Sequence, residues 1–405
     1  MPAPNWTTVR SRLRGLRAHI PTPPWPRHWD ERLRRLALAG IVVVALLLAG
    51  LSILLQRSGG DDDADPAPVQ APEKVTRELG RLALAQKADA VVISGFATAN
   101  AAARLARESE VGGILVGPED WYGSFKGRTL LSRLQAQSSV GGRTPPLVVG
   151  RQEGGAYRSY PSLPPALGQR DIAATGDPAE AREWAAQTGR VMTKVGFDMN
   201  LAPIADVSTL DSPLSDRAFS DDPVVVTAMA GAAAQGCRES GMACAMPFFP
   251  GLGASSQSTL EGPASVGLDP ESLSVRDLEP FRAAIRQQVP ALVLSLALYA
   301  GYDPVTPGAL SPSVATGLLR DDLGYKGVAI SDDLSTGVPA TSLSPPKAAV
   351  RALAAGSDMV VVSDPGEAAA ARDAIARAAR SGGLPSERLD QAAARALSLR
   401  QRFAE

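Results

Sequence analysis

The stretch Gly327–Leu334 (GVAISDDL) carries the residues with the clearest chemical potential in this chain. Val328 to Ser331 read as a short buried strand, and it ends in two consecutive carboxylates, Asp332 and Asp333. In parallel α/β proteins the catalytic groups sit at the carboxyl ends of strands. A carboxylate pair there can supply a nucleophile or an acid/base group. The alternative is that one aspartate caps the next helix or forms a salt bridge with a neighbouring loop.

This strand is one of a series of short apolar runs, and the stretches between them are rich in Ala, Leu and Arg with helical periodicity. Several of these stretches begin with an N-cap residue followed by Pro, as at Asp177-Pro178 and Ser311-Pro312. Repeated strand–helix units predict an α/β fold, a (β/α)₈ TIM barrel, and a doubly wound open sheet is the alternative. The runs are Ala90–Ile93, Gly113–Val116, Leu147–Val149, Met199–Pro203, Ala243–Met246, Ala291–Leu296, Gly327–Ser331 and Met359–Val362.

A last helix is expected near Ser386–Arg402, either outside the barrel or closing its base. The composition agrees with a globular domain of this size, because 45% of the 405 residues are hydrophobic and 20% are charged. A net charge of −1 argues against a nucleic-acid partner.

The amino-terminal region differs sharply from the rest. Residues 1–35 are rich in Arg, Pro and Trp, whereas Leu36–Gln56 carries no charge. About 20 apolar residues at 1.5 Å each cross a ~30 Å hydrocarbon core, so this segment is predicted to be a transmembrane helix. The flank before it is basic and the flank after it, Gly59–Asp65, is acidic. The positive-inside rule therefore predicts a single-pass cell-membrane protein with a cytoplasmic N-terminus and an extracytoplasmic barrel.

The predicted organisation has four parts. Residues 1–35 form a cytoplasmic tail, residues 36–56 the transmembrane helix, residues 57–75 a flexible acidic and Pro-containing linker, and residues 76–405 the barrel domain. The two cysteines of the chain, Cys237 and Cys244, both fall in the barrel domain. A disulfide is permitted in an oxidising compartment, and two separately buried thiols are equally compatible with the sequence.

Six motifs in a fixed order resemble the barrel domain of the family 3 glycoside hydrolases, and the similarity runs from about residue 75 to residue 402. It is greatest to the single-domain bacterial β-N-acetylglucosaminidases (β-N-acetylhexosaminidases) of peptidoglycan turnover. Such a resemblance implies a retaining mechanism that passes through a glycosyl–enzyme intermediate. The motifs are QEGG (Gln152–Gly155), NLAPIADV (Asn200–Val207), DRAF (Asp216–Phe219), FPGLG (Phe249–Gly253), LSPS (Leu310–Ser313) and SDDL (Ser331–Leu334).

The resemblance assigns roles to four of these residues. Asp332 stands at the position of the catalytic nucleophile, which would attack the anomeric carbon. Arg217 matches a residue that binds the sugar. Asp206 and Glu153 occupy family-typical positions near strand ends, where their roles are at least partly structural.

Elsewhere in the site the chain departs from the family pattern. The family reads K-H-F-P-G-H-G-D after the fifth strand, and here Pro247 and Phe248 replace the Lys and His that hold sugar hydroxyls. A following D-x-H, whose His is the general acid/base, corresponds here to Ser258, Thr259 and Leu260.

Three further positions are replaced. The family's Asp before QEGG, a sugar-hydroxyl acceptor, is Arg151 in this chain. The Arg after QEGG is Ala156, and a His at the end of the sixth strand is Leu296. Arg151 at the pocket could favour an acidic group such as a muramyl carboxylate.

The histidine count leads to the same conclusion without an alignment. The chain has two histidines, His19 and His28, and both precede the predicted transmembrane helix. A histidine acid/base in the barrel domain is therefore excluded for this chain. Glu261, beside the lost His position, is a candidate substitute acid, although loop carboxylates are usually only solvated.

Three hypotheses follow. The first is a catalytically impaired or silent hydrolase domain retained to bind cell-wall glycan, a muropeptide or an envelope protein. The second is an active retaining hydrolase of amino sugars that uses Asp332 and a non-His acid such as Glu261. The third is a structural envelope module that acts through its cytoplasmic tail. No motif indicates a metal, nucleotide or other cofactor.

Overall fold

The structure is a computed structural model, and it describes residues 72–108, 111–118, 129–134, 143–336 and 343–404. The predicted tail, the transmembrane helix Leu36–Gln56 and most of the predicted linker lie outside the described residues, so these remain predictions. No helix within the described ranges has the length and apolar character needed to cross a bilayer. The first described helix, α3 (Glu73–Leu79), begins inside the stretch predicted as linker.

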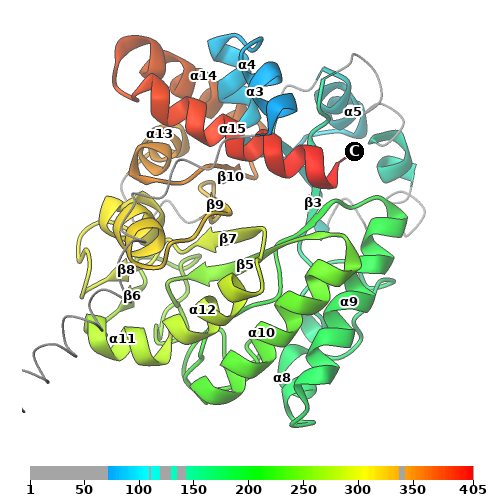
Figure 1. Cartoon of the computed structure of the whole chain (residues 1–405), viewed down its shortest axis with the longest axis vertical. Coiled ribbons are helices and arrows are strands. Elements are labelled where there is room, and N and C mark those ends of the chain that lie inside the picture. The colour runs from blue at the N-terminus through cyan, green and yellow to red at the C-terminus, as the bar shows by residue number, and fades with distance from the viewer. Residues whose placement is uncertain (1–71, 109–110, 119–128, 135–142, 337–342, 405) are drawn as a thin grey trace, which may run out of the picture. The chain divides into compact units, whose positions relative to one another are not determined.

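Eight parallel strands form a nearly closed barrel, as the apolar runs predict (Figure 1). Each strand contains part of one predicted run, and most are three or four residues long. Along the barrel wall the strands are β10 (Val360–Val362), β1 (Val92–Ser94), β2 (Gly113–Leu115), β3 (Leu147–Gly150), β4 (Met199–Asn200), β5 (Ala243–Phe249), β7 (Ala291–Leu294) and β9 (Val328–Ser331).

The two ends of this order meet between β9 and β10. A parallel bridge joins Ile330 to Met359, and the backbone N–H of Ser331 donates to the Met359 carbonyl at 2.9 Å. A separate two-stranded parallel sheet pairs β6 (Ser265–Val266) with β8 (Leu298–Tyr299). The result is a TIM-like α/β barrel rather than the alternative open sheet.

Side chains alternate between two apolar layers, as the period of a strand requires. In β1, Ile93 packs with the barrel interior, while Val92 packs with the helices outside. The inner layer contains alternate residues of neighbouring strands, and all are buried because both faces of a parallel sheet are covered. Its members include Ile93, Leu147, Val149, Met199, Leu201, Ala243, Ala245, Ala291, Val293, Val328, Ile330, Met359 and Val361.

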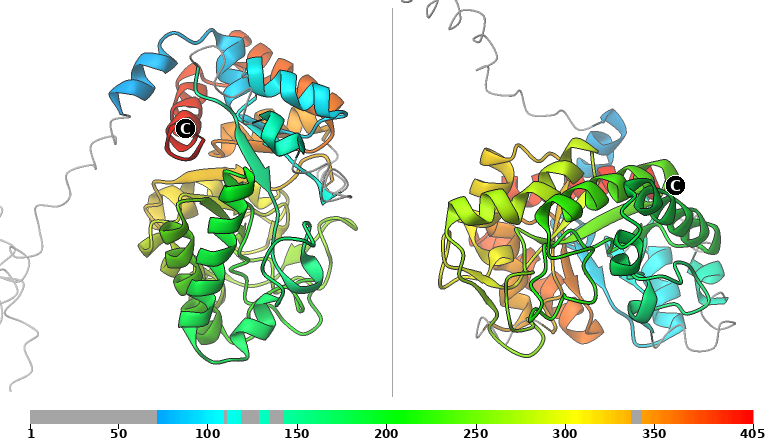
Figure 2. Two further views of the ribbon diagram at one scale, coloured as in Figure 1. Left: turned by 90° about the vertical axis from the view of Figure 1, so that its right-hand side faces the viewer. Right: turned by 90° about the horizontal axis from the view of Figure 1, so that it is seen from below.

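Helices surround the barrel, and Figure 2 shows them from two further sides. Between β1 and β5 the chain forms α5, η2, α8, α9 and α10, and between β5 and β9 it forms α11, α12, η3 and η4, the last of these a π-helix. The bounds are α4 (Leu84–Ala90), α5 (Ala99–Glu108), η2 (Gly155–Tyr157), α8 (Gln169–Ala173), α9 (Pro178–Val195), α10 (Pro223–Ser240), α11 (Pro270–Arg276), α12 (Leu278–Arg286), η3 (Gly308–Leu310), η4 (Ser313–Asp322), α13 (Pro345–Ala355), α14 (Pro365–Ser381) and α15 (Ser386–Phe403).

Helix starts follow the Asp-Pro signals. Asp177 accepts a hydrogen bond from the N–H of Ala179, and Asp222 accepts one from Val224. The Ser311-Pro312 signal also marks a helix start, because Pro312 is helical and leads directly into η4. The Ser311 hydroxyl donates to Asp303 there, and its carbonyl accepts from the N–H of Ala315.

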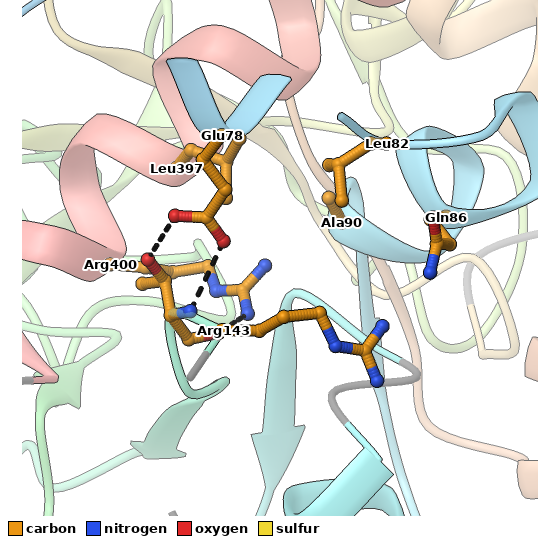
Figure 3. Close-up of a pocket in the computed structure, with 8 residues that line it drawn as sticks. Glu78, Leu82, Gln86, Ala90, Arg143, Leu397 and Arg400 are labelled. Carbon is orange, nitrogen blue, oxygen red and sulfur yellow. Dashed lines mark hydrogen bonds between the residues drawn. The ribbon is translucent and has the colours of Figure 1, made fainter. Parts of the chain in front are cut away.

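The final helix, α15, closes the base of the barrel, which is the second of the two expected arrangements. Its Ala396 and Leu399 pack with the inner layer of strand residues. Beside them a polar cluster joins α15 to α3 and to the segment before β3 (Figure 3). Glu78 accepts from the N–H and the hydroxyl of Thr144, and Arg400 donates to the Pro145 carbonyl at 2.9 Å. The cavity beside them is about 10 Å³, enough for one water molecule.

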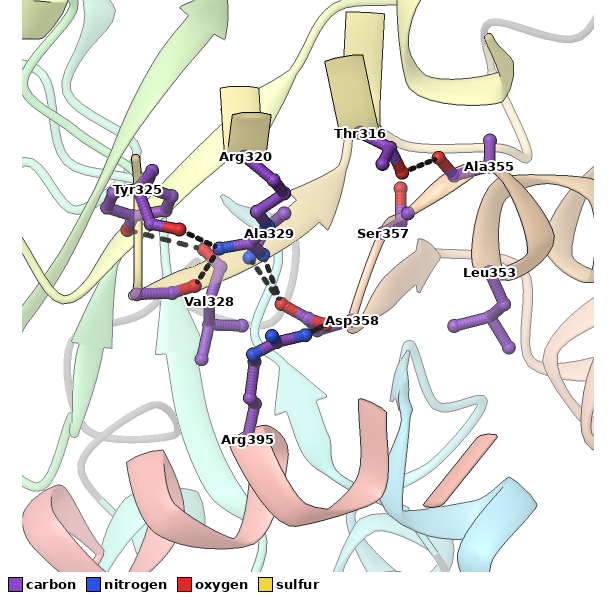
Figure 4. A network of polar contacts seen from close by, with 12 residues as sticks. Thr316, Arg320, Tyr325, Val328, Ala329, Leu353, Ala355, Ser357, Asp358 and Arg395 are labelled. Atoms are coloured by element: carbon purple, nitrogen blue, oxygen red, sulfur yellow. Dashed lines mark hydrogen bonds and ion pairs between the residues drawn. The ribbon is translucent and has the colours of Figure 1, made fainter. Parts of the chain in front are cut away.

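A buried carboxylate, Asp358, fixes the base on the other side (Figure 4). It lies just before β10 and has no exposed surface. Arg320 of η4 donates to it at 2.6 Å, and Arg388 and Arg395 of α15 each donate at 2.9 Å. Three guanidinium groups from two helices therefore converge on one carboxylate.

Cys237 and Cys244 form a disulfide, which resolves the choice that the sequence left open. Their Cα atoms are 6.0 Å apart, and both side chains are buried. The bond joins the last turn of α10 to β5, the strand that leads to the pocket described next.

Candidate active site

A cavity of about 320 Å³ opens at the carboxyl ends of the barrel strands. Leu115 ends β2, Arg151 follows β3, Phe248 belongs to β5 and Asp332 follows β9. The site therefore forms where the barrel topology predicts it. The lining residues are Leu115, Val116, Gly117, Pro118, Arg151, Ser159, Pro213, Leu214, Arg217, Phe248, Leu252, Ser258, Thr259, Leu260, Asp332, Asp333, Thr336 and Val361.

The QEGG segment is held by a buried glutamine. The side-chain amide of Gln152 donates to the carbonyls of Tyr160, Leu163 and Pro164, and its oxygen accepts from the Tyr160 N–H. The Gln152 backbone in turn exchanges hydrogen bonds with the amide of Asn200, which begins NLAPIADV. Two of the motifs thus fix one another and the direction of the residues on either side of Gln152.

The glycines of QEGG are required by close backbone packing. Gly154 has a φ of 106°, and a Cβ there would lie 2.4 Å from the Leu167 carbonyl oxygen. Gly155 has a φ of 55°, and its Cβ would lie 2.9 Å from the Gly168 backbone. Side chains at these positions would be both strained and blocked.

Glu153 and Arg217 form a closed pair in the wall of the pocket. The Nε and a terminal nitrogen of Arg217 donate to the two Glu153 oxygens at 2.8 and 2.6 Å. The guanidinium also lies over the rings of Tyr157 and Phe248, at 5.5 and 5.7 Å from their centroids. Burial alone would lower the pKa of Arg217, but the Glu153 carboxylate raises it overall. Arg217 is therefore a fixed cation whose charge is balanced locally.

Asp332 lies buried at the bottom of the pocket. Its backbone N–H donates to the Leu294 carbonyl, and its Oδ1 accepts from the N–H of Asp333 at 2.9 Å. The same oxygen is 3.5 Å from a terminal nitrogen of Arg151. Burial raises the pKa of Asp332 above its ordinary value, against the opposing effect of the Arg151 charge.

Asp333 has a different environment from its neighbour. Its Oδ1 accepts from the backbone N–H groups of Ser335 and Ser363, each at 3.0 Å. The carboxylate therefore fixes the turn after β9 against the end of β10. The role is structural, as the alternative for one of the two aspartates expects, but the contacts are to backbone N–H groups and not those of a helix cap or a salt bridge.

Asp206 anchors the loop that replaces the family's Lys-His motif. It is fully buried, and its two oxygens accept from the N–H groups of Phe248 at 2.8 Å and Leu252 at 2.5 Å. Burial raises its pKa to about 7. Below the same loop, Gly251 adopts a φ of 131° and packs against Asp277, which is paired with Arg276. Asp206 thus positions Phe248 and Leu252, whose side chains line the pocket.

The structure brings most of the predicted site residues together and leaves one apart. Asp332, Arg151 and Arg217 line the cavity, with Glu153 directly behind Arg217 and Asp206 beneath the loop of Phe248. Glu261 is exposed and is not among the lining residues. That Glu261 acts as the proton donor stays a prediction. This role would require the loop that carries Glu261 to take a different position.

Three features of the site have no clear signal in the sequence. These are the contact between Arg151 and Asp332, the stacking of Tyr157 on Arg217, and the support that Asp277 gives to Gly251. In each case the partners are distant in the sequence or come from irregular loops. The replacement of an acidic residue by Arg151 is the one hint, because it places a cation at the end of β3. No group of three His, Cys, Asp or Glu side chains suited to a metal occurs among the described residues.

The fold and the pocket together define a TIM-like barrel protein whose site is built on a buried carboxylate after a barrel strand. Residues 77–399 match the model of the "Glycosyl hydrolase family 3 N terminal domain". The chain belongs to glycosyl hydrolase family 3, as the six motifs predict.

Characterised relatives agree with this family. The chain is 31% identical over 388 residues to the beta-hexosaminidase LpqI of Mycobacterium tuberculosis, covering 92% of this chain and 97% of LpqI. The solved structure of M. tuberculosis LpqI superposes with a TM-score of 0.72 at 29% identity, covering 83% and 98% of the two chains. A family 3 beta-N-acetylglucosaminidase from a Paenibacillus species gives a TM-score of 0.76 at 30% identity, covering 80% of this chain and 63% of that one.

Proposed function

We propose that this chain is a membrane-anchored, extracytoplasmic β-N-acetylhexosaminidase-like domain of cell-wall carbohydrate metabolism that binds glycan or muropeptide with impaired or no hydrolysis. The observation that carries the proposal is the contact between Arg151 and Asp332, 3.5 Å apart at the bottom of the pocket. A guanidinium beside a carboxylate stabilises its negative charge, which makes the carboxylate a weaker nucleophile.

The composition of the barrel domain supports impaired hydrolysis. Cleavage of a glycosidic bond needs a proton donor for the leaving oxygen as well as a nucleophile. The pocket holds no histidine, since both histidines of the chain lie before residue 36. Ser258, Thr259 and Leu260 line the pocket where the family resemblance expects the acid/base. Phe248 and Leu252 make the wall apolar where a sugar offers hydroxyl groups.

Two observations support the location. Leu36–Gln56 is uncharged and long enough to span a bilayer, and it separates a basic from an acidic flank. The disulfide between Cys237 and Cys244 is typical of an oxidising compartment. Alkylation of single cysteines introduced at Ser58 and Ser11, in cells and with a membrane-impermeant reagent, tests the topology. Labelling at Ser58 alone is expected, and labelling at Ser11 alone would reverse the orientation.

An active retaining hydrolase is the second candidate, and the position of Asp332 favours it. This carboxylate is buried after β9 in an intact SDDL motif, and Arg217 of the DRAF motif is hydrogen-bonded to Glu153. An acid such as Glu261 would then have to reach the leaving oxygen.

Hydrolysis of an activated aryl N-acetyl-β-glucosaminide by the full-length chain separates the two candidates. An activated leaving group needs little acid assistance, so the assay reports on the nucleophile alone. We expect no turnover above that of Asp332→Asn. Turnover that disappears in Asp332→Asn would establish the active enzyme, and Glu261→Gln would then test the acid. Arg151→Asp, which removes the opposing cation, is expected to raise turnover above the wild-type level if Arg151 is the cause of the impairment.

A further inference from the structure

Arg151 is a partly buried cation, and most of its N–H groups have no hydrogen-bond partner within the described residues. Its side chain is 36% exposed, and its one polar side-chain contact within the described ranges is the 3.5 Å approach to Asp332. A guanidinium carries five N–H donors in a planar fork suited to carboxylates. Arg217, in the same cavity, has short bonds to both oxygens of Glu153 and two aromatic faces around it. Arg217 spends two of its five donors on Glu153, whereas Arg151 makes only one long contact, so Arg151 is the less satisfied of the two cations.

The rest of the cavity suits a ligand that is partly apolar and partly polar. Its volume of about 320 Å³ lies within the ~300–1,000 Å³ range of small-molecule sites. Phe248 and Leu252 form part of an apolar wall. The hydroxyl-bearing side chains of Ser159, Ser258 and Thr336 lie in the lining and can bond to hydroxyl or amide groups.

The other charged groups around Asp332 already have hydrogen-bond partners. Arg217, from the loop after β4, is balanced by Glu153, and Asp333 is held by two backbone N–H groups. An anion bound to Arg151 therefore meets one opposing group of importance, the carboxylate of Asp332. Protonation of Asp332 removes that repulsion.

We propose that the cavity takes a carboxylate-bearing amino sugar whose carboxylate binds Arg151 and whose ring lies against the wall of Phe248 and Leu252. The inference rests on the proposed glycan binding and specifies the class of glycan. Arg151 then acts as a specificity-determining residue for the pocket.

A consequence is that binding is coupled to proton uptake by Asp332. Burial raises the pKa of Asp332, and the positive charge of Arg151 opposes that rise. A ligand carboxylate on Arg151 cancels the opposing charge, so Asp332 binds a proton more tightly in the complex. By linkage, the affinity for the acidic sugar rises as the pH falls, and it does so only while Asp332 can titrate.

Calorimetric titration of the full-length chain with two sugars tests the inference. The two sugars share the same ring. N-acetylmuramic acid carries a lactyl group with a carboxylate on this ring, and N-acetylglucosamine lacks that group. We expect the acid to bind at least about tenfold more tightly, the ratio that one charge-assisted bidentate contact typically supports. Arg151→Gln should reduce the ratio to about one to threefold. The matched control, Arg190→Gln, changes an exposed arginine of α9 and should leave the ratio intact.

The pH dependence supplies an independent readout. The affinity for N-acetylmuramic acid should rise as the pH falls in the wild type, and this slope should vanish in Asp332→Asn. Thermal unfolding of each variant confirms that it is folded. Equal affinity for the two sugars, or an unchanged ratio in Arg151→Gln, overturns the inference and leaves glycan binding standing. Hydrolysis of the aryl glycoside overturns the proposed impairment and leaves the preference for acids standing. If neither sugar binds, both are overturned.

Discussion

The two ends of the barrel use arginine in opposite ways. At the base, Asp358 is fully buried and accepts from three guanidinium groups at 2.6 to 2.9 Å. At the mouth, Arg151 is partly exposed and approaches Asp332 at 3.5 Å. Charge at the base is neutralised by short contacts and fixes one packing of α15 on the strands. Charge at the mouth is only loosely paired, which is the state a ligand can exploit.

The contribution of an ion pair to the stability of this fold depends on its geometry and burial. A buried charge with short contacts is costly to break because removal of one partner leaves the other uncompensated. An exposed pair contributes little to stability because water solvates both groups. The expected effects of substitution on stability therefore decrease from the base to the mouth, and the effects on binding increase.

The largest loss of stability is expected for Asp358→Ala. The change leaves Arg320, Arg388 and Arg395 facing one another without a carboxylate, at a cost of about 3–5 kcal/mol in the free energy of unfolding. Urea unfolding followed by circular dichroism measures it. Asp373→Ala, at an exposed position of α14, should change stability by less than about 0.5 kcal/mol. A loss below about 1 kcal/mol in Asp358→Ala would remove the distinction between base and mouth.

An intermediate effect is expected for Arg217→Gln, in the wall of the pocket. Glu153 is 4% exposed and would lose both of its short contacts, which should cost about 2–3 kcal/mol. Arg182 forms a similar pair with Glu239 on the surface, where the two side chains are 49% and 34% exposed. Arg182→Gln is the matched control, and its loss of stability should be clearly smaller because water solvates both groups. Equal losses in the two variants would show that burial does not decide the effect.

The two buried carboxylates near the Phe248 loop, Asp206 and Asp277, predict how the free energy of unfolding changes with pH. Burial raises the pKa of Asp206 to about 7 and that of Asp277 to about 6, both from 3.8. A raised pKa means that the folded state holds its proton more tightly than the unfolded state. This contribution is complete at low pH and is lost as the pH rises through about 6 to 7, by on the order of 2 kcal/mol between pH 5 and pH 8.

Denaturant unfolding at a series of pH values measures that slope. Asp206→Asn should make it shallower, because the amide does not titrate, and the part due to Asp277 should remain. Asp177→Asn is the control, since Asp177 caps α9 at the surface and Asn caps a helix equally well. A slope that is the same in Asp206→Asn as in the wild type would assign the pH dependence to other groups.

The smallest loss of stability is expected for Arg151→Gln. Its contact with Asp332 is long and partly solvated, so the change should cost less than about 1 kcal/mol while it abolishes the preference for acidic sugars. Unfolding and calorimetric titration of the same preparation compare the two effects directly. A loss of stability as large as that of Asp358→Ala would make Arg151 a structural residue like those of the base.

The regular part of the fold could be predicted from the sequence, because apolar runs and Asp-Pro caps act over a few residues. The eight barrel strands, the caps at Asp177 and Asp222, and the position of Asp332 after β9 belong to this class. The strands β6 and β8 could not be predicted, since neither lies within one of the eight apolar runs, whereas the equally short β4 does.

The candidate site divides in the same way. The motifs identify Arg151, Glu153, Arg217 and Asp332 individually, and the barrel topology brings them to one end. Their pairing is a separate matter, because Arg151 and Asp332 lie 181 residues apart in the sequence. Which carboxylate each arginine contacts depends on the loops of Gln152 and Tyr157, and no local pattern specifies it. Nevertheless, the contact with Arg151 decides whether Asp332 is available as a nucleophile.

The pairing of β1 with β10 also sets the order of events in folding. The first barrel strand has no partner on one side until Val360–Val362 has been synthesised. The inner layer is completed still later, when Ala396 and Leu399 of α15 enter it. The barrel therefore cannot close before these segments have been made. A chain that stops before α15 would leave the apolar inner layer uncovered at the base.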